Sequence, residues 1–365
     1  MTKVRFSRRD VLKGSAAVAA GLWASPDAGK FMQPAQAQVA ALPEPSAITP
    51  ALIAAARKEG KVSFYTAVDL PVAERFVKAF SAKFPGISVR VERTGAERLF
   101  QRIGQEMASN IHAVDVVNSS DAAHSITWKR NGWLAPYLPE DVAKHFPAEH
   151  RDPDGMYASF RTGLSVVGYN TNLVKREDAP KSFADLLDPK WMGKMVKSHP
   201  AYSGSTMTAT FQMARDLGWD YFEKLARQRV MQLQSGNDPP KKLELGERAV
   251  MADGNEYTLL QIKEAGRPVE VVYPTEGTPF IIGPSSVFKS APNPNAARLM
   301  QCYMYTAEAQ QLIVDAGALR SVHPHIKEKP GRKPLREIKL MKDDPAAVEK
   351  QSDEIKARYS KLFGV

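Results

Sequence analysis

Small hydroxyl-bearing residues gather in front of one predicted helix. The stretch SHPAYSGST places Ser203, Ser205 and Thr206 around Gly204, directly before an amphipathic pattern over residues 204–217. Free backbone N–H groups and the positive end of the helix dipole make such a helix start a binding site for an anion. The same side chains would also serve as an ordinary helix cap. Their position relative to other polar groups has to decide between the two interpretations.

Polar side chains also follow three predicted strands in the first half of the chain. The strands are expected at 61–66, 87–92 and 113–118, and helix patterns separate them. Ligands of such sheets bind beyond the carboxyl ends of the strands, so the loops after these strands form the natural binding surface. The candidates in these loops are Thr66, Asp69, Arg93, Thr94, Ser119 and Ser120.

Several of the candidates are open to more than one interpretation. Arg93 could hold a phosphate or carboxylate through two hydrogen bonds, or simply be solvated at the end of its strand. Asp69 does not suit an anionic ligand, and could instead cap a helix or bind a ligand hydroxyl or amine. Asn237, in the turn SGN, suits a polar contact or a plain turn. Tyr257, in MADGNEYTLLQ, could donate its hydroxyl to an oxyanion, cover a ligand with its ring, or pack at a lobe boundary.

Motifs that assemble a catalytic site are missing from the sequence. It contains no GxSxG motif, no P-loop and no glycine fingerprint of a dinucleotide-binding fold. His145 and His150, in HFPAEH, lack the spacing of a zinc protease, and His323-Pro-His325 is expected in a surface turn. We therefore expect a protein that is not an enzyme and that carries no resident cofactor or metal.

The N-terminus carries the pattern of an export signal. Residues 7–13 (SRRDVLK) resemble the twin-arginine motif, and the Ala/Gly-rich stretch that follows is too short and too weakly apolar to anchor in a bilayer. Ala35-Gln36-Ala37 offers a cleavage site of the small-x-small type. We expect a signal peptide over 1–37, a linker over 38–47, and export to the periplasm by the twin-arginine pathway.

The positive charge of the chain does not indicate a nucleic-acid partner. Of the formal charge of +10, residues 1–37 carry +4 and residues 326–365 carry +4, which leaves only +2 for the body between them. A basic stripe with interleaved aromatic residues, which would track a phosphate backbone, is missing. The single cysteine, Cys302, lies in a helical pattern and is expected to be a small buried residue rather than half of a disulfide.

The order of the predicted elements implies an α/β protein with two lobes. A chain of 365 residues is too long for one typical core, and strands that alternate with helices imply parallel βαβ units. Extended stretches over 157–170 and 280–289 connect the two sets of elements. We expect a first lobe over 48–160 and 279–325, a second lobe over 161–278, and a C-terminal tail and helix over 326–365 that pack on the first lobe.

Several stretches resemble the iron-type and anion-type periplasmic solute-binding proteins of ABC importers. These are KSFADLLDPKWMGKM (181–195), VYPTEGT (272–278), APNPNAA (291–297) and the helix pair that contains EAQ and DAG (308–317). The resemblance covers nearly all of residues 47–325. It implies a type II fold with a hinged cleft between two lobes, a small-molecule solute as ligand, an inner-membrane ABC permease as partner, and a monomer.

The resemblance also bears on the choice of solute. In the ferric-ion members two adjacent tyrosines stand at the helix start that Tyr257 occupies here, and they bind iron as phenolates. This chain has Glu256-Tyr257 instead, and the histidine that some members carry near the first strand is missing from KVSFYTAVDLP. We therefore predict a small organic anion, which could be a phosphonate, a sugar phosphate or a carboxylate. The alternatives are ferric iron held by Tyr257 and Glu256, an exported sensory binding protein, and a hydrolase.

Overall fold

The structure is a computed structural model, and it describes residues 42–365. The expected signal peptide over 1–37 and the first part of the linker lie outside the described residues. The strands are β1 (Lys61–Thr66), β2 (Ser88–Arg93), β3 (Val116–Asn118), β4 (Ala158–Asn170), β5 (Met195–Ser198), β6 (Met231–Leu233), β7 (Val250–Asn255), β8 (Val269–Val272) and β9 (Phe280–Val287).

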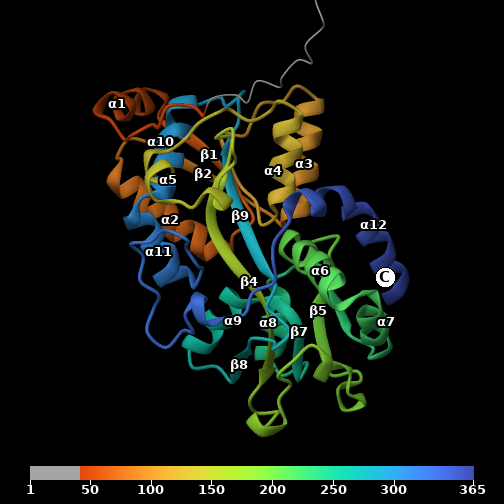
Figure 1. Cartoon of the computed structure of the whole chain (residues 1–365). Coiled ribbons are helices and arrows are strands. Elements are labelled where there is room, and N and C mark those ends of the chain that lie inside the picture. Colours follow the sequence, from red (N-terminus) through yellow and green to blue (C-terminus); the bar gives the residue numbers. More distant parts are fainter. Residues whose placement is uncertain (1–41) are drawn as a thin grey trace, which may run out of the picture. The chain divides into compact units, whose positions relative to one another are not determined.

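Twelve α-helices alternate with these strands in residues 42–365 (Figure 1). They are α1 (Pro50–Glu59), α2 (Leu70–Lys83), α3 (Ala96–Ala108), α4 (Ala122–Arg130), α5 (Glu140–His145), α6 (Gly204–Leu217), α7 (Trp219–Arg227), α8 (Asp238–Glu244), α9 (Glu256–Glu264), α10 (Pro294–Tyr305), α11 (Ala307–Gly317) and α12 (Pro345–Phe363). None of the helices in this part of the chain combines the length and the apolar character needed to cross a membrane.

The strands form two parallel groups joined by antiparallel crossing strands. The strand order is β2-β1-β3-β9-β4-β7-β5-β6, with β8 also paired to β4. Strands β2, β1 and β3 are parallel to one another, as are β6, β5 and β7. We call the first group, with its helices, the first lobe, and the second group the second lobe. The parallel βαβ arrangement predicted within each lobe is therefore confirmed.

Strand β4 belongs to both lobes. Its residues from Ala158 to Leu164 pair antiparallel with β9, and its residues from Ser165 onward pair with β7 and β8. In Figure 1 this long strand runs from the elements of the first lobe into those of the second. Because both faces of β4 are covered, twelve of its thirteen residues are buried, and Gly163 is the exception. A charged residue within β4 is consequently unusual.

Each lobe has its own apolar core, rich in aromatic rings. In the first lobe Phe76 and Phe80 of α2 pack against Tyr303 of α10, with ring centroids 5.5 and 5.6 Å apart. In the second lobe Phe222 of α7 lies within 6.0 Å of the ring of Tyr359 in α12. The predicted burial of the cysteine is also confirmed, since Cys302 is a free thiol that is 3% exposed. Residues 42–365 thus gain their stability from packed cores.

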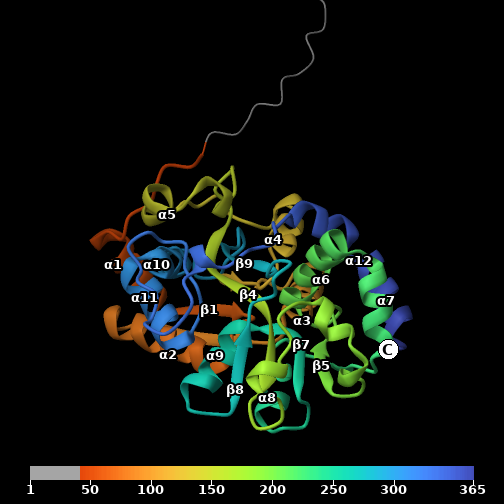
Figure 2. The same ribbon diagram turned by 60° about the horizontal axis from the view of Figure 1, so that its bottom comes forward.

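The C-terminal segment packs on both lobes. Residues 326–365 were predicted to pack on the first lobe; α12 does contact α4 of that lobe, and the segment contacts the second lobe as well. Arg332 forms an ion pair with Glu264 of α9, and the Tyr359 hydroxyl donates to Gln232 of β6 at 2.8 Å. Lys356 of the same helix reaches Glu97 of the first lobe. Figure 2 shows α12 beside α6 and α7. A helical pattern gives the apolar face of a helix but not the identity of its neighbours.

A carboxyl group that precedes α12 makes the stability of the protein depend on pH. Burial, together with the nearby Asp121, raises the pKa of Asp343 to about 7. A group with a raised pKa binds more protons in the folded state than in the unfolded one, so its contribution to stability is lost as pH rises from about 4 through about 7. We expect Asp343→Asn to be more stable than the wild type at pH 8, since the amide oxygen still accepts from Gln212 and from the Asp344 N–H.

The measurement is urea unfolding of the wild type and of Asp343→Asn at pH 5 and pH 8. The variant should gain stability at pH 8 and little or nothing at pH 5. Asp353→Asn, on the exposed face of α12, serves as the control and should change neither midpoint. An equal shift at both pH values would contradict the explanation by ionisation.

Candidate functional site

A small cavity lies where loops of the first lobe meet helix starts of the second. Its volume is about 30 Å³, which is room for one or two water molecules. Residues from both lobes line it, and Arg161 of the crossing strand β4 lies among them. The lining residues are Ala67, Arg93, Gly95, Ala96, Ser120, Arg161, Tyr202, Ser203, Ser205, Ser235, Gly236, Asn237, Asn255 and Tyr257.

Six of the eleven predicted ligand-binding residues line this cavity. They are Arg93, Ser120, Ser203, Ser205, Asn237 and Tyr257. The remaining five do not line it, and they are Thr66, Asp69, Thr94, Ser119 and Thr206. The predicted convergence of strand-end loops with the start of α6 is thus present in the geometry, with a smaller set of side chains.

Three of the hydroxyls that do not line the cavity are hydrogen-bonded elsewhere in the protein. The Thr66 hydroxyl accepts from the Val68 N–H at 3.1 Å, and the Ser119 hydroxyl is hydrogen-bonded to His124 Nδ1 at 2.9 Å. The Thr206 hydroxyl is bonded to that of Ser198 on β5, behind the helix start. Short hydroxyl side chains readily satisfy nearby groups of their own chain, and a sequence pattern does not tell which way they turn.

Arg161 is the most unusual residue of the site. It lies in β4, is only 4% exposed, and its Nε donates to Asn118 Oδ1 at 3.3 Å. Among residues 42–365 no carboxylate forms an ion pair with it, although every other buried arginine or lysine in this part of the chain has one. Burial lowers the pKa of Arg161, partly offset by the neighbouring Tyr257. A buried guanidinium without a counter-ion faces a cavity, which is the arrangement expected for an anionic ligand.

The second arginine of the cavity is already neutralised in part. Arg93, at the end of β2, donates through Nε to the Val68 carbonyl at 3.2 Å and pairs with Asp69 at 3.5 Å. Asp69 therefore serves to hold Arg93 and, as described next, to bridge the lobes. Of the two guanidinium groups, Arg161 leaves a net positive charge in the cavity and Arg93 adds little to it.

A continuous hydrogen-bond network runs from the start of α6 to the first lobe, with Asn237 at its centre. The Ser205 hydroxyl donates to Asn255 Oδ1 at 2.8 Å, and Asn255 Nδ2 donates to Asn237 Oδ1 at 2.6 Å. Asn237 Nδ2 in turn donates to Asp69 Oδ1 at 2.9 Å. The network fixes the side chains around the cavity and links the two lobes directly.

Three helices begin at the cavity. Each of α3, α6 and α9 contributes two residues near its start to the lining of the cavity. These residues are Gly95 and Ala96 of α3, Ser203 and Ser205 of α6, and Asn255 and Tyr257 of α9. The Ser203 hydroxyl accepts from the Thr206 N–H at 3.3 Å and so caps α6, which leaves the earlier amides of the first turn, those of Gly204 and Ser205, for other partners. Three positive helix ends and Arg161 together give the cavity a positive field.

Tyr257 lies at the cavity with its hydroxyl engaged. The hydroxyl donates to Asn237 Oδ1 at 2.7 Å. Burial, and then the charge of Asp69, raise the pKa of Tyr257, so the phenol stays protonated at neutral pH. The loop before α6 contributes a second phenol, Tyr202. Tyr257 is buried and also lines the cavity, so its role toward a ligand stays a prediction.

Glu256, the second residue of the predicted ferric-ion ligand pair, is engaged by other side chains of the protein. Its carboxylate receives two hydrogen bonds from Arg320, from Nε and Nη2, each at 2.7 Å, and a third from the Tyr273 hydroxyl at 2.6 Å. It does not line the cavity, since residues 256 and 257 project from different sides of the first turn of α9. The arrangement offers no support for Glu256 as a metal ligand beside Tyr257, and the ferric alternative held by these two residues stays a prediction.

Sequence reasoning missed several residues of the cavity, chiefly Arg161, Asn255, Tyr202 and Ser235. A signal for Arg161 was present, because it is the only charged residue in the extended stretch ASFRTGLSVVGYN. A charge inside a strand buried on both faces needs a partner or a ligand. The neighbour in β9 makes room for it: a Cβ on Gly283 would lie 2.9 Å from Arg161 Cγ.

Two parts of the sequence match known families. Residues 114–336 match the family described as bacterial extracellular solute-binding protein, and residues 5–22 match the signal sequence of the twin-arginine translocation pathway. A probable ABC transporter periplasmic-binding protein of Sinorhizobium fredii is 26% identical over 215 residues, which is 56% of this chain and 58% of that protein.

Solved structures share the fold at low sequence identity. The periplasmic binding protein AfuA from Actinobacillus pleuropneumoniae, with fructose-6-phosphate bound, superposes with a TM-score of 0.77 at 22% identity and covers 84% of this chain and 99% of that one. Iron-bound HitA from Pseudomonas aeruginosa gives 0.72 at 24% identity, over 83% and 99%. The two-lobed periplasmic binding protein fold predicted from the sequence is thereby confirmed.

The family and the signal sequence agree with the architecture of the site. A cavity lined from both lobes and from the crossing strand suits the capture of a solute between the lobes. The export signal directs the chain to the periplasm, where proteins of this family bind small molecules and work with ABC transporter permeases. The chain belongs to the family of bacterial extracellular solute-binding proteins.

Proposed function

We propose that this protein captures a small organic anion, such as a sugar phosphate, a phosphonate or a carboxylate, and delivers it to an inner-membrane ABC permease. The observation that supports the proposal most strongly is the buried, uncompensated guanidinium of Arg161 at the cavity. An anionic group of the ligand supplies the missing counter-charge and accepts hydrogen bonds from the guanidinium. The hydroxyl and amide groups of Ser203, Ser205 and Asn237 suit the remaining oxygen atoms of such a ligand.

The proposed solute requires a wider cleft than the one described above. A cavity of about 30 Å³ holds water but not a sugar phosphate. The lobes touch closely at Gly204, where a Cβ would lie 2.8 Å from Asp121 Cβ and 3.0 Å from Ala96 Cβ. The solute therefore enters after the lobes separate about β4 and β9, and the closed form is stabilised by contacts with both lobes at once.

The direct test is native mass spectrometry of the protein purified without added ligand, followed by thermal-shift measurements against sugar phosphates, phosphonates, carboxylates and neutral sugars. We expect a co-purifying anion, or a rise in Tm with members of the anionic classes. A response to neutral sugars alone would contradict the proposed solute class.

Gly236 offers a test of the cavity that removes none of its polar groups. A Cβ at this position would lie 2.6 Å from Ser203 Oγ, 3.0 Å from Asn255 Nδ2 and 3.2 Å from Ser205 Oγ. We expect Gly236→Ala to weaken binding of the anion found above at least about tenfold, because the methyl group displaces ligand-facing side chains. Isothermal titration calorimetry measures the change. Gly104→Ala, where a Cβ meets nothing within 4 Å, is the control and should bind like the wild type.

Ferric iron is the second candidate solute, and a specific observation favours it. Two phenols, Tyr202 and Tyr257, line the cavity, and phenolate oxygen is a suitable donor for Fe³⁺. The raised pKa of Tyr257 and the positive charge of Arg161 both oppose a cation in the same place. We expect addition of ferric citrate to give no visible tyrosinate-to-iron absorbance band. A band that appears in the wild type and is lost in Tyr257→Phe would favour iron over the organic anion.

A further inference from the structure

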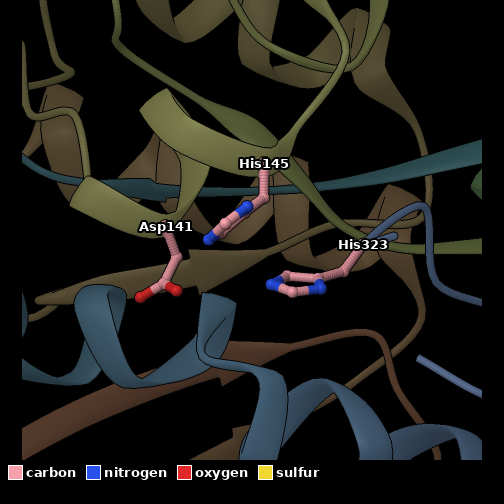
Figure 3. A group of neighbouring side chains, drawn as sticks. All are labelled: Asp141, His145 and His323. Carbon is pink, nitrogen blue, oxygen red and sulfur yellow. The ribbon is translucent and has the colours of Figure 1, made fainter. Parts of the chain in front are cut away.

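Three residues far apart in the sequence form a compact cluster outside the cavity. Asp141 and His145 lie one turn apart on α5, and His323 follows α11. One potential ligand atom from each lies within 4.8 Å of those from the other two. Figure 3 shows the carboxylate of Asp141 and the rings of His145 and His323 turned toward a common point. The sequence alone did not connect them, since His145 and His323 are separated by most of the second lobe.

The donor atoms of this cluster are not all in use. His323 is 3% exposed, its Nδ1 accepts from the His325 N–H at 3.2 Å, and its buried Nε2 has no hydrogen-bond partner. An unpartnered buried nitrogen is costly unless a ligand supplies what is missing.

A second group of potential metal ligands within residues 42–365 differs in that its polar atoms are already hydrogen-bonded to the protein. Glu97, Asp121 and His124 also lie close together and are buried. Both ring nitrogens of His124 are hydrogen-bonded, to Ser119 at 2.9 Å and to Glu97 at 3.1 Å. Glu97 also pairs with Lys356, and Asp121 caps α4. This second group is saturated by protein partners, whereas the cluster at His323 is not.

We propose that Asp141, His145 and His323 form a binding site for a divalent transition metal of the Zn²⁺ type. Two imidazoles and one carboxylate are a donor set that zinc accepts, with bonds of about 2.0–2.2 Å and the remaining position left to water or a fourth ligand. Such bonds bring the ligand atoms to within about 3.4 Å of one another, so the side chains tighten by about 1 Å. The exposed His325, whose ring centroid lies 5.0 Å from that of His145, is near enough to become the fourth ligand.

The site would tie the segment after α11 to the surface helix α5. Coordination through His323 Nε2 places the ring hydrogen on Nδ1, so the weak contact with the His325 N–H gives way and the turn at 323–325 adjusts. His323 also lines a surface groove with Val322 and Pro324, which gives the metal a path from solvent. The metal then links positions 145 and 323 in residues that contain no disulfide.

The test uses the tag-free protein, treated with EDTA and dialysed, and titrates it with Zn²⁺ by calorimetry and with Co²⁺ by visible absorbance. We expect one Zn²⁺ per chain, an intense d–d band of Co²⁺ in low-coordinate geometry, and a rise in Tm with Zn²⁺. Asp141→Asn and His145→Asn, both partly exposed, should each weaken Zn²⁺ binding at least about tenfold. His112→Asn, at an exposed histidine elsewhere, is the matched control and should bind like the wild type.

The remaining outcomes overturn the proposal. Wild-type protein that takes up no Zn²⁺, or a His145→Asn variant that binds as tightly as the wild type, would show that the cluster is not a metal site. Zinc binding that survives His145→Asn but is lost in Tyr257→Phe would place the metal in the cavity between the lobes. Circular dichroism confirms that each variant is folded, so a loss of binding is not mistaken for a loss of structure.

Discussion

Replacement of Arg161 by methionine should weaken binding of the anionic solute by at least about thirtyfold, the largest effect we expect from any single change at the cavity. Removing one member of a buried, hydrogen-bonded charge pair costs about 2–5 kcal/mol, and 1.4 kcal/mol corresponds to a factor of ten in Kd. In the ligand-free protein the same change removes a buried charge that has no counter-ion within residues 42–365. The free energy of unfolding should therefore stay unchanged or rise by up to about 2 kcal/mol.

The opposite signs of the two effects separate a ligand-binding role from a structural one. Calorimetric titration gives the affinity, and urea unfolding without ligand gives the stability. Arg93→Met is the matched comparison at the same cavity. Because Asp69 already neutralises Arg93 in part, its loss should cost less affinity than the loss of Arg161. If Arg161→Met bound the solute normally and lost stability instead, the guanidinium would be part of the scaffold and the proposed solute class would lose its main support.

The arrangement of elements was largely accessible from the sequence because local rules decide it. Helix α6 begins and ends where predicted, at Gly204 and Leu217, since Ser203 caps its start and Gly218 follows its end. Strand β1 also has the predicted bounds, 61–66. The packing partners of α12 could not be predicted in this way. Its buried residues Val348, Ile355 and Tyr359 indicate that one face of the helix is apolar, but not which elements that face contacts.

The site was predictable at the level of loops and helix starts, but not at the level of single side chains. The topology of parallel strands brings the ends of β1, β2 and β3 to one edge, and this rule led to Arg93 and Ser120. Whether a hydroxyl turns toward the cavity or back toward its own loop depends on contacts made across the fold. Thr66 and Ser119 illustrate the second case, since each is hydrogen-bonded within two to five residues of its own position.

Long-range pairing is the information that the sequence pattern lacks. Asn237 gains its role from Asp69, which lies in the other lobe, and His323 acquires its neighbours from α5. Glu256 shows that closeness in sequence can also mislead. Its position beside Tyr257 suggested a shared ligand, while its actual partner, Arg320, lies 64 residues further along the chain.

Replacement of Arg320, the partner of Glu256, should cause the largest loss of stability that we expect from a single change. The Arg320 and Glu256 side chains are 5% and 1% exposed, and two hydrogen bonds of 2.7 Å join them. Arg320→Met leaves the carboxylate buried without its counter-charge, which costs about 3–5 kcal/mol. Urea unfolding of the ligand-free protein should show this loss. Affinity for the solute should be unchanged when measured on the folded fraction, because neither residue lines the cavity.

A double replacement makes this expectation specific to the ion pair. Glu256→Gln in the Arg320→Met background removes the stranded charge, so the double variant should be more stable than Arg320→Met alone. Arg336→Met is the control, since Arg336 is highly exposed and its ion pair with Glu337, at 3.8 Å, should contribute little. The opposite outcome would be a Glu256→Gln variant that no longer binds ferric iron but keeps its stability. Glu256 would then be a metal ligand, and its two hydrogen bonds with Arg320 would have to open when the ion enters.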